Sequence, residues 1–221
     1  MYITILGSCR QDILQEKYKT SIIKNQISYP HYTKEILQLV NFCLFNDIPN
    51  QNTNQIFRTP ILNNKPIIWN QNIKNEFDKT DVFVIEIASR KTYKLNNYFV
   101  HHILYDNFPY NKNTKNLIEL GESTDLEIEE DIIKLKDLLK KPIIIVSHLV
   151  TRNFGSRFEL KELLKNICSK HNIIFIDPIQ ELKDNFENID SFFNKENILA
   201  HYSNQGNEAI GYIYQKFLNN I

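Results

Sequence analysis

Four short apolar runs constrain the fold of this chain more than any other feature. Residues 2–6, 82–88, 142–146 and 173–176 are almost entirely aliphatic or aromatic, and stretches with helical periodicity separate them. A strand with one face in water alternates apolar and polar residues, whereas a strand buried on both faces is apolar throughout. The alternation of such strands with helices predicts an α/β protein with a parallel sheet covered on both faces.

The helices are predicted from apolar residues spaced three and four positions apart. A first helix is expected over residues 11–17, and two of the three cysteines, Cys43 and Cys168, fall on apolar helix faces and are interpreted as core residues. The predicted faces are Ile36, Val40, Cys43 and Leu44; Ile128, Ile132, Leu135 and Leu139; Leu160, Leu163, Leu164, Ile167 and Cys168; and Ala209, Ile210, Ile213 and Phe217.

Three segments between these elements are less regular. Residues 21–28 are interpreted as a short strand or an extended segment. Residues 46–75 are rich in Asn, Gln and Pro and are interpreted as a long connection with one short strand at 66–69. The Asn96-Asn97 pair between aromatic and β-branched residues predicts a β-hairpin within residues 93–105.

Length and charge limit the class of protein. A chain of 221 residues suits a single α/β domain over residues 1–221 with a sizeable core. The 26 Lys and Arg residues equal the 26 Asp and Glu residues, so no overall field attracts nucleic acid or a membrane surface. That balance still allows a local basic pocket for a small phosphorylated ligand.

Nothing in the sequence predicts secretion or a membrane span. No apolar stretch reaches the roughly 18–20 residues that cross a bilayer, and no basic segment followed by an apolar run opens the chain. Three widely spaced cysteines argue against a disulfide framework and against a zinc site. We therefore expect a cytoplasmic protein in a reducing compartment.

Polar residues follow each of the four predicted strands. Ligands of open parallel sheets bind beyond the carboxyl ends of the strands, so these side chains are expected to meet at one edge. His201, in the loop that opens the final helix, is expected at the same edge. The residues after the strands are Ser8, Cys9 and Arg10; Ser89, Arg90 and Lys91; Ser147, His148 and Arg152; and Asp177.

The turn after the first strand is the most specific candidate. Gly7 permits a sharp change of direction, and Ser8 with Gln11 three residues later has the pattern of a helix capping box. A helix that starts there would surround Cys9 with free backbone N–H groups, which lower a thiol pKa and bind anions. The alternative is a plain strand-to-helix connection that contains a small buried cysteine.

Cys9 and His201 pair as a candidate nucleophile and base, because a nucleophile needs a group that takes its proton. This arrangement resembles the SGNH (GDSL-type) hydrolase superfamily, in which a Gly-Asp-Ser motif follows the first strand and an Asp-x-x-His motif lies near the carboxyl terminus. Here Gly7-Ser8-Cys9 falls on the first motif, and His201 followed by Gly206 has the spacing of the second. The resemblance implies a three-layer flavodoxin-like, SGNH-type fold with the hairpin as an insertion.

Two departures point to one branch of that superfamily. Ile198 stands where the orienting aspartate is usual, with Asn197 or Glu196 as partial substitutes, and no oxyanion-hole asparagine follows the central strand. The branch that opens with Gly-Ser-Cys, which includes coenzyme A-binding capsular-polysaccharide biosynthesis proteins, is more similar. Residues 30–35 and 147–152 also resemble its signatures.

The resemblance implies an acetyltransferase that moves an acetyl group from acetyl-CoA to an amino or hydroxy sugar, or a nucleotide sugar, in glycan biosynthesis. Catalytic roles fall to Cys9, His201 and Ser8, and the partner is a small molecule rather than nucleic acid or membrane. Two alternatives stay open: a carbohydrate acetylesterase, and a sugar- or nucleotide-binding module without catalysis.

Ligand-binding roles are assigned to cations, imidazoles and hydroxyls near the predicted edge, since phosphates attract Arg and Lys. Glu86 is costly inside an apolar strand unless it meets an arginine or a backbone donor, and it is expected to orient a catalytic group. His101 and His102 are expected on opposite faces of a hairpin strand, so no metal site is expected. The candidates are Arg10, His31, Lys34, Glu86, Ser89, Arg90, Lys91, His148, Arg152 and Arg157.

Overall fold

A five-stranded parallel sheet forms the centre of the computed structural model, which describes residues 1–27, 29–106, 112–194 and 201–221. The strand order is β2-β1-β3-β7-β8, and every neighbouring pair is parallel. The predicted α/β class is confirmed, and the four apolar runs are β1, β3, β7 and β8. The strands are β1 (Tyr2–Leu6), β2 (Lys19–Thr20), β3 (Val82–Ile87), β7 (Ile143–Ser147) and β8 (Ile174–Ile176).

The strand order reverses in the middle of the sheet. β1 pairs with β2 on one side and with β3 on the other, and the chain then continues outward through β7 to β8. This is the flavodoxin-like order 2-1-3-4-5, in which ligands bind in the crevice between the first and third strands. The order therefore places a candidate site where β1 and β3 end.

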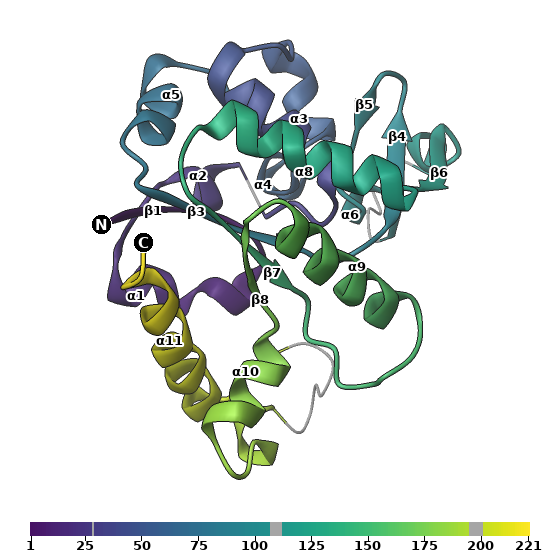
Figure 1. Cartoon of the computed structure of the whole chain (residues 1–221). Coiled ribbons are helices and arrows are strands. Elements are labelled where there is room, and N and C mark those ends of the chain that lie inside the picture. Colours follow the sequence, from purple (N-terminus) through teal and green to yellow (C-terminus); the bar gives the residue numbers. More distant parts are fainter. Residues whose placement is uncertain (28, 107–111, 195–200) are drawn as a thin grey trace.

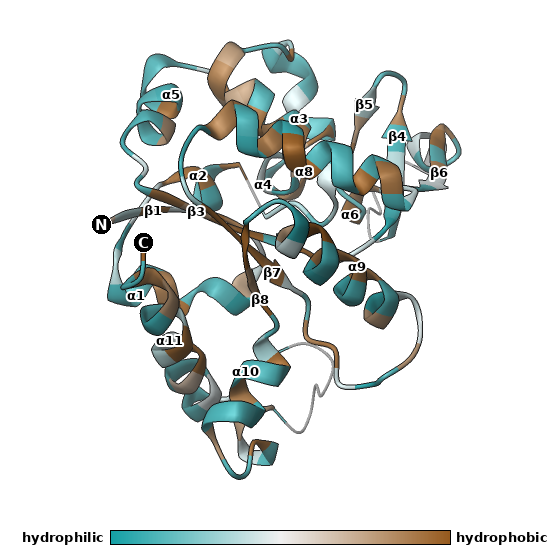
Figure 2. Cartoon of the chain, in the orientation of Figure 1, coloured by the Kyte–Doolittle hydropathy of each residue, from teal (hydrophilic) through white to brown (hydrophobic). Residues whose placement is uncertain are grey.

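Helices cover both faces of this sheet (Figure 1). Phe83 and Ile85 of β3 pack with one helical layer, and Val82 and Val84 pack with the other. Figure 2 shows β3, β7 and β8 as mostly apolar, as expected for strands that meet helices on both sides. The first layer includes α3 (Thr33–Phe45), α8 (Asp125–Leu139) and α9 (Ser156–Lys170); the second includes α1 (Ile13–Lys17), α10 (Pro178–Asn185) and α11 (Asn204–Leu218).

The predicted core residues occupy these layers. Cys43 of α3 and Cys168 of α9 are almost completely buried, which confirms their assignment to the core. Burial of an aliphatic side chain of the size found here contributes roughly 1.5–3 kcal/mol to folding. The two layers thus supply most of the free energy that holds the sheet.

The predicted hairpin is confirmed and belongs to a small antiparallel sheet of order β5-β4-β6. β4 (Lys91–Leu95) and β5 (Tyr98–Phe99) turn at Asn96, whose φ of 54° suits asparagine. β6 (Ile118–Glu122) pairs with the other edge of β4. The Tyr32 hydroxyl donates to the Val100 carbonyl at 2.7 Å, which joins the hairpin to the start of α3.

The segment predicted as a strand near residues 21–28 is instead helical. Residues Ile23–Gln26 form α2, and Ile23 and Ile27 are both fully buried. These two residues lie four positions apart, which is a helical spacing and not the alternation of a strand. The prediction of a strand or extended segment was therefore wrong.

The strand predicted at residues 66–69 is also absent. The chain from residue 46 to residue 78 forms η2 (Asn50–Gln55), α4 (Arg58–Asn63) and α5 (Gln71–Asp78) instead. Side chains replace strand pairing here: Thr53 Oγ1 accepts the Ile67 N–H at 2.8 Å, and Asn70 Oδ1 accepts the Asn72 N–H at 3.0 Å and caps α5. Asparagine favours such caps over regular pairing.

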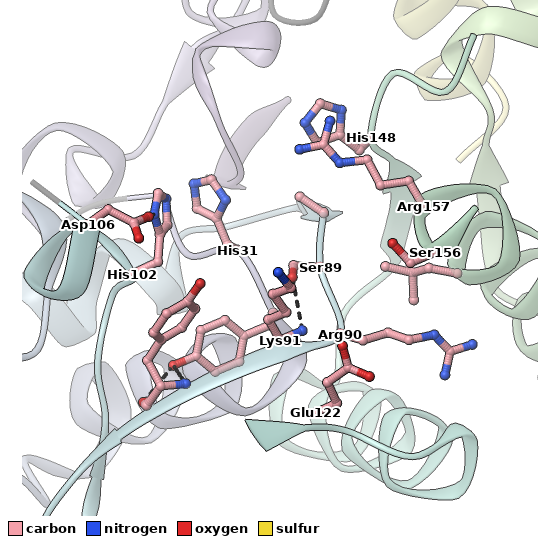
Figure 3. A pocket seen from close by; sticks show the side chains of 14 residues that line it. His31, Ser89, Arg90, Lys91, His102, Asp106, Glu122, His148, Ser156 and Arg157 are labelled. Carbon is pink, nitrogen blue, oxygen red and sulfur yellow. Dashed lines mark hydrogen bonds and ion pairs between the residues drawn. The ribbon is translucent and has the colours of Figure 1, made fainter. Parts of the chain in front are cut away.

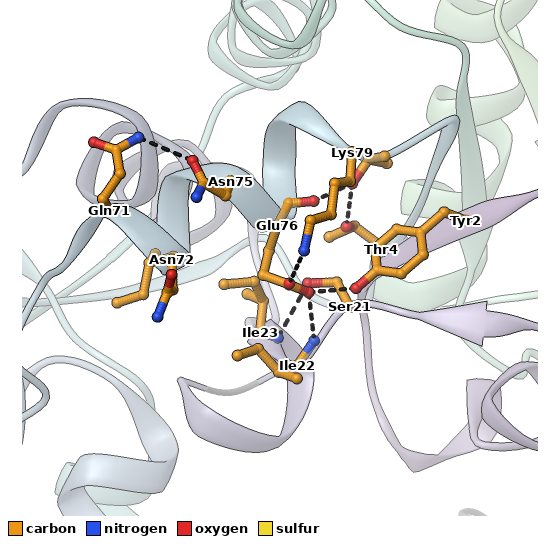
Figure 4. A network of polar contacts seen from close by, with 12 residues as sticks. Tyr2, Thr4, Ser21, Ile22, Ile23, Gln71, Asn72, Asn75, Glu76 and Lys79 are labelled. Atoms are coloured by element: carbon orange, nitrogen blue, oxygen red, sulfur yellow. Dashed lines mark hydrogen bonds and ion pairs between the residues drawn. The ribbon is translucent and has the colours of Figure 1, made fainter.

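Glu76 of α5 ties three elements together (Figure 4). Its carboxylate accepts hydrogen bonds from the Tyr2 hydroxyl of β1, from the Ile22 N–H at 3.2 Å and from the Lys79 ammonium at 3.1 Å. Burial raises the pKa of Glu76, but the hydrogen bonds from Tyr2 and Lys79 outweigh it and hold that pKa below its ordinary value. Glu76 thus fastens α5 to the edge of the main sheet.

The remaining helices are short. None of the helices in the described part of the chain is both long and apolar enough to cross a bilayer. The short helices are η1 (Cys9–Gln11), α6 (Ile103–Asp106), α7 (Lys112–Lys115) and η3 (Asp190–Phe192).

Candidate active site

The turn after β1 packs directly against β3. A Cβ atom at Gly7 would lie 2.7 Å from Gln11 Oε1 and 3.0 Å from Glu86 Cβ, so this position has no room for a side chain. The Ser8 N–H donates to Glu86 Oε2 at 2.8 Å. The turn is therefore fixed by a carboxylate from the neighbouring strand.

The predicted capping box at Ser8 and Gln11 is wrong. The Ser8 N–H donates to Glu86 and not to Gln11, and the Gln11 N–H donates to the Ser8 carbonyl at 3.2 Å. A single 3-10 turn follows, in which the Asp12 N–H donates to the Cys9 carbonyl at 3.0 Å. Ser8 still caps this turn, since its Oγ accepts the Arg10 N–H at 3.4 Å. The N–H groups of Ser8, Arg10, Gln11 and Asp12 are thus occupied, and the expected ring of free donors around Cys9 does not form.

Glu86, Arg10 and Ser8 form a buried polar network beneath the turn. Arg10 Nη1 lies 3.3 Å from Glu86 Oε1 and donates to Ser8 Oγ at 2.8 Å. Glu86 is 1% exposed, so its charge requires this partner. The prediction that Glu86 meets an arginine or a backbone donor is confirmed, and Glu86 meets both.

His201 is held by backbone contacts between η3 and the start of α11. The Asn194 N–H donates to the His201 carbonyl at 3.1 Å, and Phe193 and Tyr202 form an antiparallel bridge. A Cβ atom at Gly206 would lie 2.0 Å from the Phe192 carbonyl oxygen, so only glycine allows this approach. Close packing against Phe192 thus explains why a glycine stands five residues after His201.

Cys9 and His201 lie together although 192 positions separate them. Cys9 Sγ is 3.5 Å from His201 Nδ1, a hydrogen-bond distance for sulfur. Cys9 is half-buried and the His201 side chain is exposed. The residues considered as orienting groups, Glu196, Asn197 and Ile198, lie outside the described residues.

The pKa of Cys9 is opposite to the sequence prediction. Burial raises it above its ordinary value, and the Arg10 charge, which lowers it, does not compensate. The helix that begins in this turn has only three residues, so it offers little of the positive potential of a long helix end. Cys9 is therefore a neutral thiol at pH 7.

A cavity of about 340 Å³ opens at the carboxyl ends of β3 and β7 (Figure 3). Six predicted site residues line it: His31, Ser89, Arg90, Lys91, His148 and Arg157. Sequence reasoning missed six further polar or aromatic lining residues. These are Tyr32, Tyr93, His102, Asp106, Glu122 and Ser156.

Two imidazoles of this cavity, His31 and His148, are neutral. Burial is the main cause that lowers the pKa of each to about 3, and the Arg10 guanidinium contributes to both shifts. Cys9 and His201 are not part of the lining. Arg10, which holds the Cys9 turn, thus links that turn electrostatically to the cavity.

Besides Arg10, two predicted cations do not line the cavity. Lys34 pairs with Glu127 at 3.1 Å and Asp131 at 3.6 Å, between α3 and α8. Arg152 is exposed and lies over the Phe154 ring, with 6.0 Å between guanidinium carbon and centroid. Arg90 lines the cavity but pairs there with Asp125.

The missed residues carry little local signal. Tyr93 and Glu122 belong to the small antiparallel sheet, and His102 and Asp106 follow it, so only the way that this insertion folds over the main sheet brings them to the cavity. The short spacing from His102 to Asp106 was the available clue. One helical turn separates them, and their side chains form a hydrogen bond, with 2.7 Å between His102 Nδ1 and Asp106 Oδ2.

Strand order and site together define a class. The chain is a doubly wound α/β protein with a cysteine–histidine pair and a polar cavity at the carboxyl edge of its sheet. A family model described as TviD N-terminal domain matches residues 1–110, which include β1, the Cys9 turn and β3. No curated protein matches the chain.

Two kinds of solved structure are distantly similar. A variant of Axe2, an acetyl-xylooligosaccharide esterase from Geobacillus stearothermophilus, is similar with a TM-score of 0.43 and 10% identity, over 97% of this chain and 92% of its own. A putative GDSL-like lipase from Parabacteroides merdae has a TM-score of 0.43 and 12% identity, over 97% of this chain and 94% of its own. No residue role is transferred from likenesses this distant.

Proposed function

We propose that this protein transfers an acetyl group from acetyl-CoA to an amino or hydroxyl group of a sugar or nucleotide sugar in polysaccharide biosynthesis. The 3.5 Å contact between Cys9 Sγ and His201 Nδ1 is the observation that carries the proposal. It joins a nucleophile that forms thioesters to a base that takes its proton. The likeness of the Gly-Ser-Cys turn to coenzyme A-binding polysaccharide biosynthesis proteins supports the choice of donor and pathway.

The first half of the reaction loads Cys9. His201 takes the proton from Sγ, and the sulfur attacks the carbonyl carbon of the acetyl thioester to give a tetrahedral oxyanion. When this intermediate collapses, the bond to the coenzyme A sulfur breaks, and that sulfur leaves with the proton from His201. The products are acetyl-Cys9 and free coenzyme A.

The second half transfers the acetyl group to the acceptor. The acceptor hydroxyl or amine gives a proton to His201 while its oxygen or nitrogen attacks the acetyl carbon. The Cys9 sulfur leaves and recovers the proton. A direct route, in which His201 deprotonates the acceptor beside bound acetyl-CoA, uses the same base without an acyl-enzyme.

The raised pKa of Cys9 fits a base-assisted mechanism. Burial keeps the thiol protonated at pH 7, so the sulfur becomes a strong nucleophile only when His201 accepts its proton. An uncharged thiol is also protected from oxidation while no substrate is bound. The histidine is thus expected to matter as much as the cysteine.

The cavity contains side chains that suit both the acetyl donor and the sugar acceptor. Arg157 and Lys91 carry charges that suit the phosphates of coenzyme A or of a nucleotide sugar. The neutral imidazole of His148 suits a sugar hydroxyl, because a neutral imidazole both donates and accepts a hydrogen bond. A volume of about 340 Å³ is at the lower end of the range for small-molecule sites.

The exposed side chain of His201 favours a second candidate, a carbohydrate acetylesterase. Water that reaches this imidazole would release the acetyl group from Cys9 as acetate. Both functions use the same pair of residues, and they differ in the group that attacks the acyl-enzyme.

The test is a set of assays with acetyl-CoA and a panel of amino sugars, neutral sugars and nucleotide sugars. We expect acetyl transfer by the wild type, with losses of roughly 10²–10⁴-fold in Cys9→Ala and His201→Ala. The matched control is His171→Ala, which removes a surface imidazole that pairs with Glu129. This control should retain wild-type activity.

The alternatives have distinct outcomes. Release of acetate from acetylated sugars, without thermal stabilisation by coenzyme A, would replace the transferase with the esterase. Full activity of Cys9→Ala together with an inactive His201→Ala would show direct transfer. Binding of sugars or nucleotides without either reaction would show a binding module.

A further inference from the structure

Three histidines from two loops form a tight cluster at the wall of the cavity. The His31 ring centroid lies 4.9 Å from that of His101 and 4.5 Å from that of His102, and the latter two are 4.5 Å apart. One ring nitrogen of each residue lies within 4.8 Å of the corresponding nitrogens of the other two. The prediction that His101 and His102 point apart is wrong, because both lie in the turn after β5 and not in a strand.

The backbone around the cluster is firmly held. The His31 N–H donates to Glu35 Oε2 at 2.8 Å, and the His31 carbonyl accepts the Ala88 N–H at 2.9 Å at the end of β3. The His101 N–H donates to the Ile56 carbonyl at 3.0 Å. Each loop is thus hydrogen-bonded to a different part of the core, and these hydrogen bonds hold the three rings close together.

Packing alone does not explain why a histidine is buried at position 101. The residue is 1% exposed, and its Nε2 atom has no hydrogen-bond partner in the described part of the chain. The Tyr29 carbonyl acts on the ring only weakly, as the smallest of the effects on its pKa. A buried imidazole nitrogen without a partner is costly, and it faces a cluster of two other imidazoles.

We propose that His31, His101 and His102 bind one divalent transition metal ion of the zinc class, with an open coordination position toward the cavity. Three histidine ligands and an open fourth position are typical of catalytic rather than structural zinc sites. His31 and His102 line the cavity, and Figure 3 shows their rings next to one another with Asp106 beside His102. A ligand oxygen in the cavity could therefore complete the coordination.

Asp106 prepares His102 for this role. Its Oδ2 lies 2.7 Å from His102 Nδ1, so it accepts the Nδ1 proton and leaves the Nε2 lone pair free. Histidine ligands of metals commonly donate their second ring proton to a carboxylate in this way. The carboxylate also supplies negative charge beside the cation.

The rings require small adjustments. Ligands at 2.0–2.1 Å from one tetrahedral ion lie about 3.3 Å apart, so the nitrogens must draw closer together. The Ile103 N–H donates to His101 Nδ1 at 3.1 Å, and ligation through Nε2 moves the ring proton to Nδ1 and breaks that bond. One neutral hydrogen bond is much weaker than a metal–imidazole bond, so the exchange favours the metal.

The ligand set selects the kind of metal. Imidazole nitrogens suit zinc, copper, nickel and iron. The hard ions Mg²⁺ and Ca²⁺ take oxygen ligands instead, so the three histidines disfavour them.

The test uses the chelator-treated protein in two titrations. One is with Co²⁺ and is monitored by the visible absorption of the bound ion, and the other is with Zn²⁺ and is monitored by calorimetry. We expect one equivalent to bind the wild type, and at least 100-fold weaker binding in His31→Gln and His102→Gln. Asp106→Asn should weaken binding by about 10–100-fold, as is usual for the carboxylate behind a ligand. In nitrogen-15 spectra, the Ile103 amide should shift on metal loading.

Two controls make the result specific. His171→Gln removes an imidazole at the C-cap of α9, and Cys9→Ala removes the thiol that could hold a metal with His201; both variants should bind the metal as the wild type does. Equal Co²⁺ affinity in the wild type, His31→Gln and His102→Gln would overturn the site, as would loss of binding in Cys9→Ala. Because no sugar or acetyl-CoA is present, the outcome is independent of the proposed acetyl transfer.

Discussion

Cys9, His31 and His148 are three titratable side chains whose pKa values all shift toward the neutral form. Burial is the largest cause in each case: it raises the pKa of Cys9 and lowers the pKa of His31 and His148 to about 3. Beneath them, Glu86 and Arg10 form an ion pair at low exposure and neutralise each other. The site therefore holds uncharged reactive groups above one buried ion pair.

The rate at which Cys9 is alkylated tests whether its pKa is raised. Because only the thiolate is alkylated, iodoacetamide should label Cys9 slowly at pH 7, with a midpoint above the value of about 8.5 for free cysteine. Mass spectrometry over a pH series gives the rate at each cysteine, and the buried Cys43 and Cys168 serve as internal controls. A midpoint below that of free cysteine would restore the capped-helix interpretation of the turn.

Removal of the Glu86 charge should expose the cost of the buried pair. Glu86→Gln keeps an acceptor for the Ser8 N–H but leaves the Arg10 charge without its partner, so we expect a loss of about 2–5 kcal/mol in unfolding free energy. Urea denaturation measures this loss. The double variant Arg10→Met with Glu86→Gln should recover part of it, and equal stabilities of single and double variants would contradict the argument.

Short elements rather than long helices position the reactive groups. η3 meets the start of α11 so closely that His201 is held by backbone hydrogen bonds, and the loop before α3 is pinned to the end of β3 through His31. Both junctions depend on a single residue that tolerates little change, Gly206 in one and Glu35 in the other.

Gly206→Ala should disturb the η3–α11 junction. A Cβ atom 2.0 Å from the Phe192 carbonyl oxygen forces backbone to move, and overpacking of this kind costs about 1–3 kcal/mol or more. The variant should also lose activity that depends on His201. Thermal unfolding and activity check both effects, and Gly121→Ala, where the nearest atom is a Thr92 hydroxyl 3.0 Å away, should behave as the wild type.

Glu35 should make stability depend on pH. Burial raises its pKa to about 8, so the folded protein retains a proton that the unfolded chain loses near pH 4.5. This contribution is complete below pH 4.5 and is lost as the pH rises through about 8, on the order of a few kcal/mol.

Denaturation at several pH values tests the contribution of Glu35. Glu35→Gln keeps an acceptor for the His31 N–H and should flatten the profile between pH 4.5 and 8. The exposed carboxylate of Glu159, changed to Gln, is the matched control on α9 and should leave the profile as it is. An unchanged slope in Glu35→Gln would contradict the assignment.

Both halves of the chain contribute residues to the candidate site. β3 lies between β1 and β7, so the central strand of the sheet pairs with an early strand and a late one. Cys9 comes from the first half and His201 from the last loop. The region that the family model matches, residues 1–110, therefore contains Cys9 without His201.

Residues 1–110 alone should not fold cooperatively. Without β7, α8 and α9, one edge of β3 has no partner and the apolar face that includes Phe83 and Ile85 is uncovered. Circular dichroism and thermal unfolding of this fragment measure the effect, with the full chain as reference. A sharp unfolding transition of the fragment would mean that the first half is an independent unit.

The sequence by itself determined the layers of this fold and the two ends of its candidate site. Continuous apolar runs mark strands buried on both faces, because period and burial are local properties of a segment. The Gly7 turn and the Gly206 spacing identified Cys9 and His201 because close backbone approaches demand glycine at fixed positions. Glu86 was found because an acid in an apolar strand must have a partner.

The tertiary structure alone decided two things: the protonation states at the site, and which residues of distant loops meet at the cavity. Burial sets the pKa of Cys9, and the packing of the whole turn against Glu86 replaces the capping box that the sequence suggests. His31 and His102 meet only because a loop before α3 and a turn after β5 are both pinned to the core. Such contacts join segments about 70 residues apart, and no local pattern encodes them.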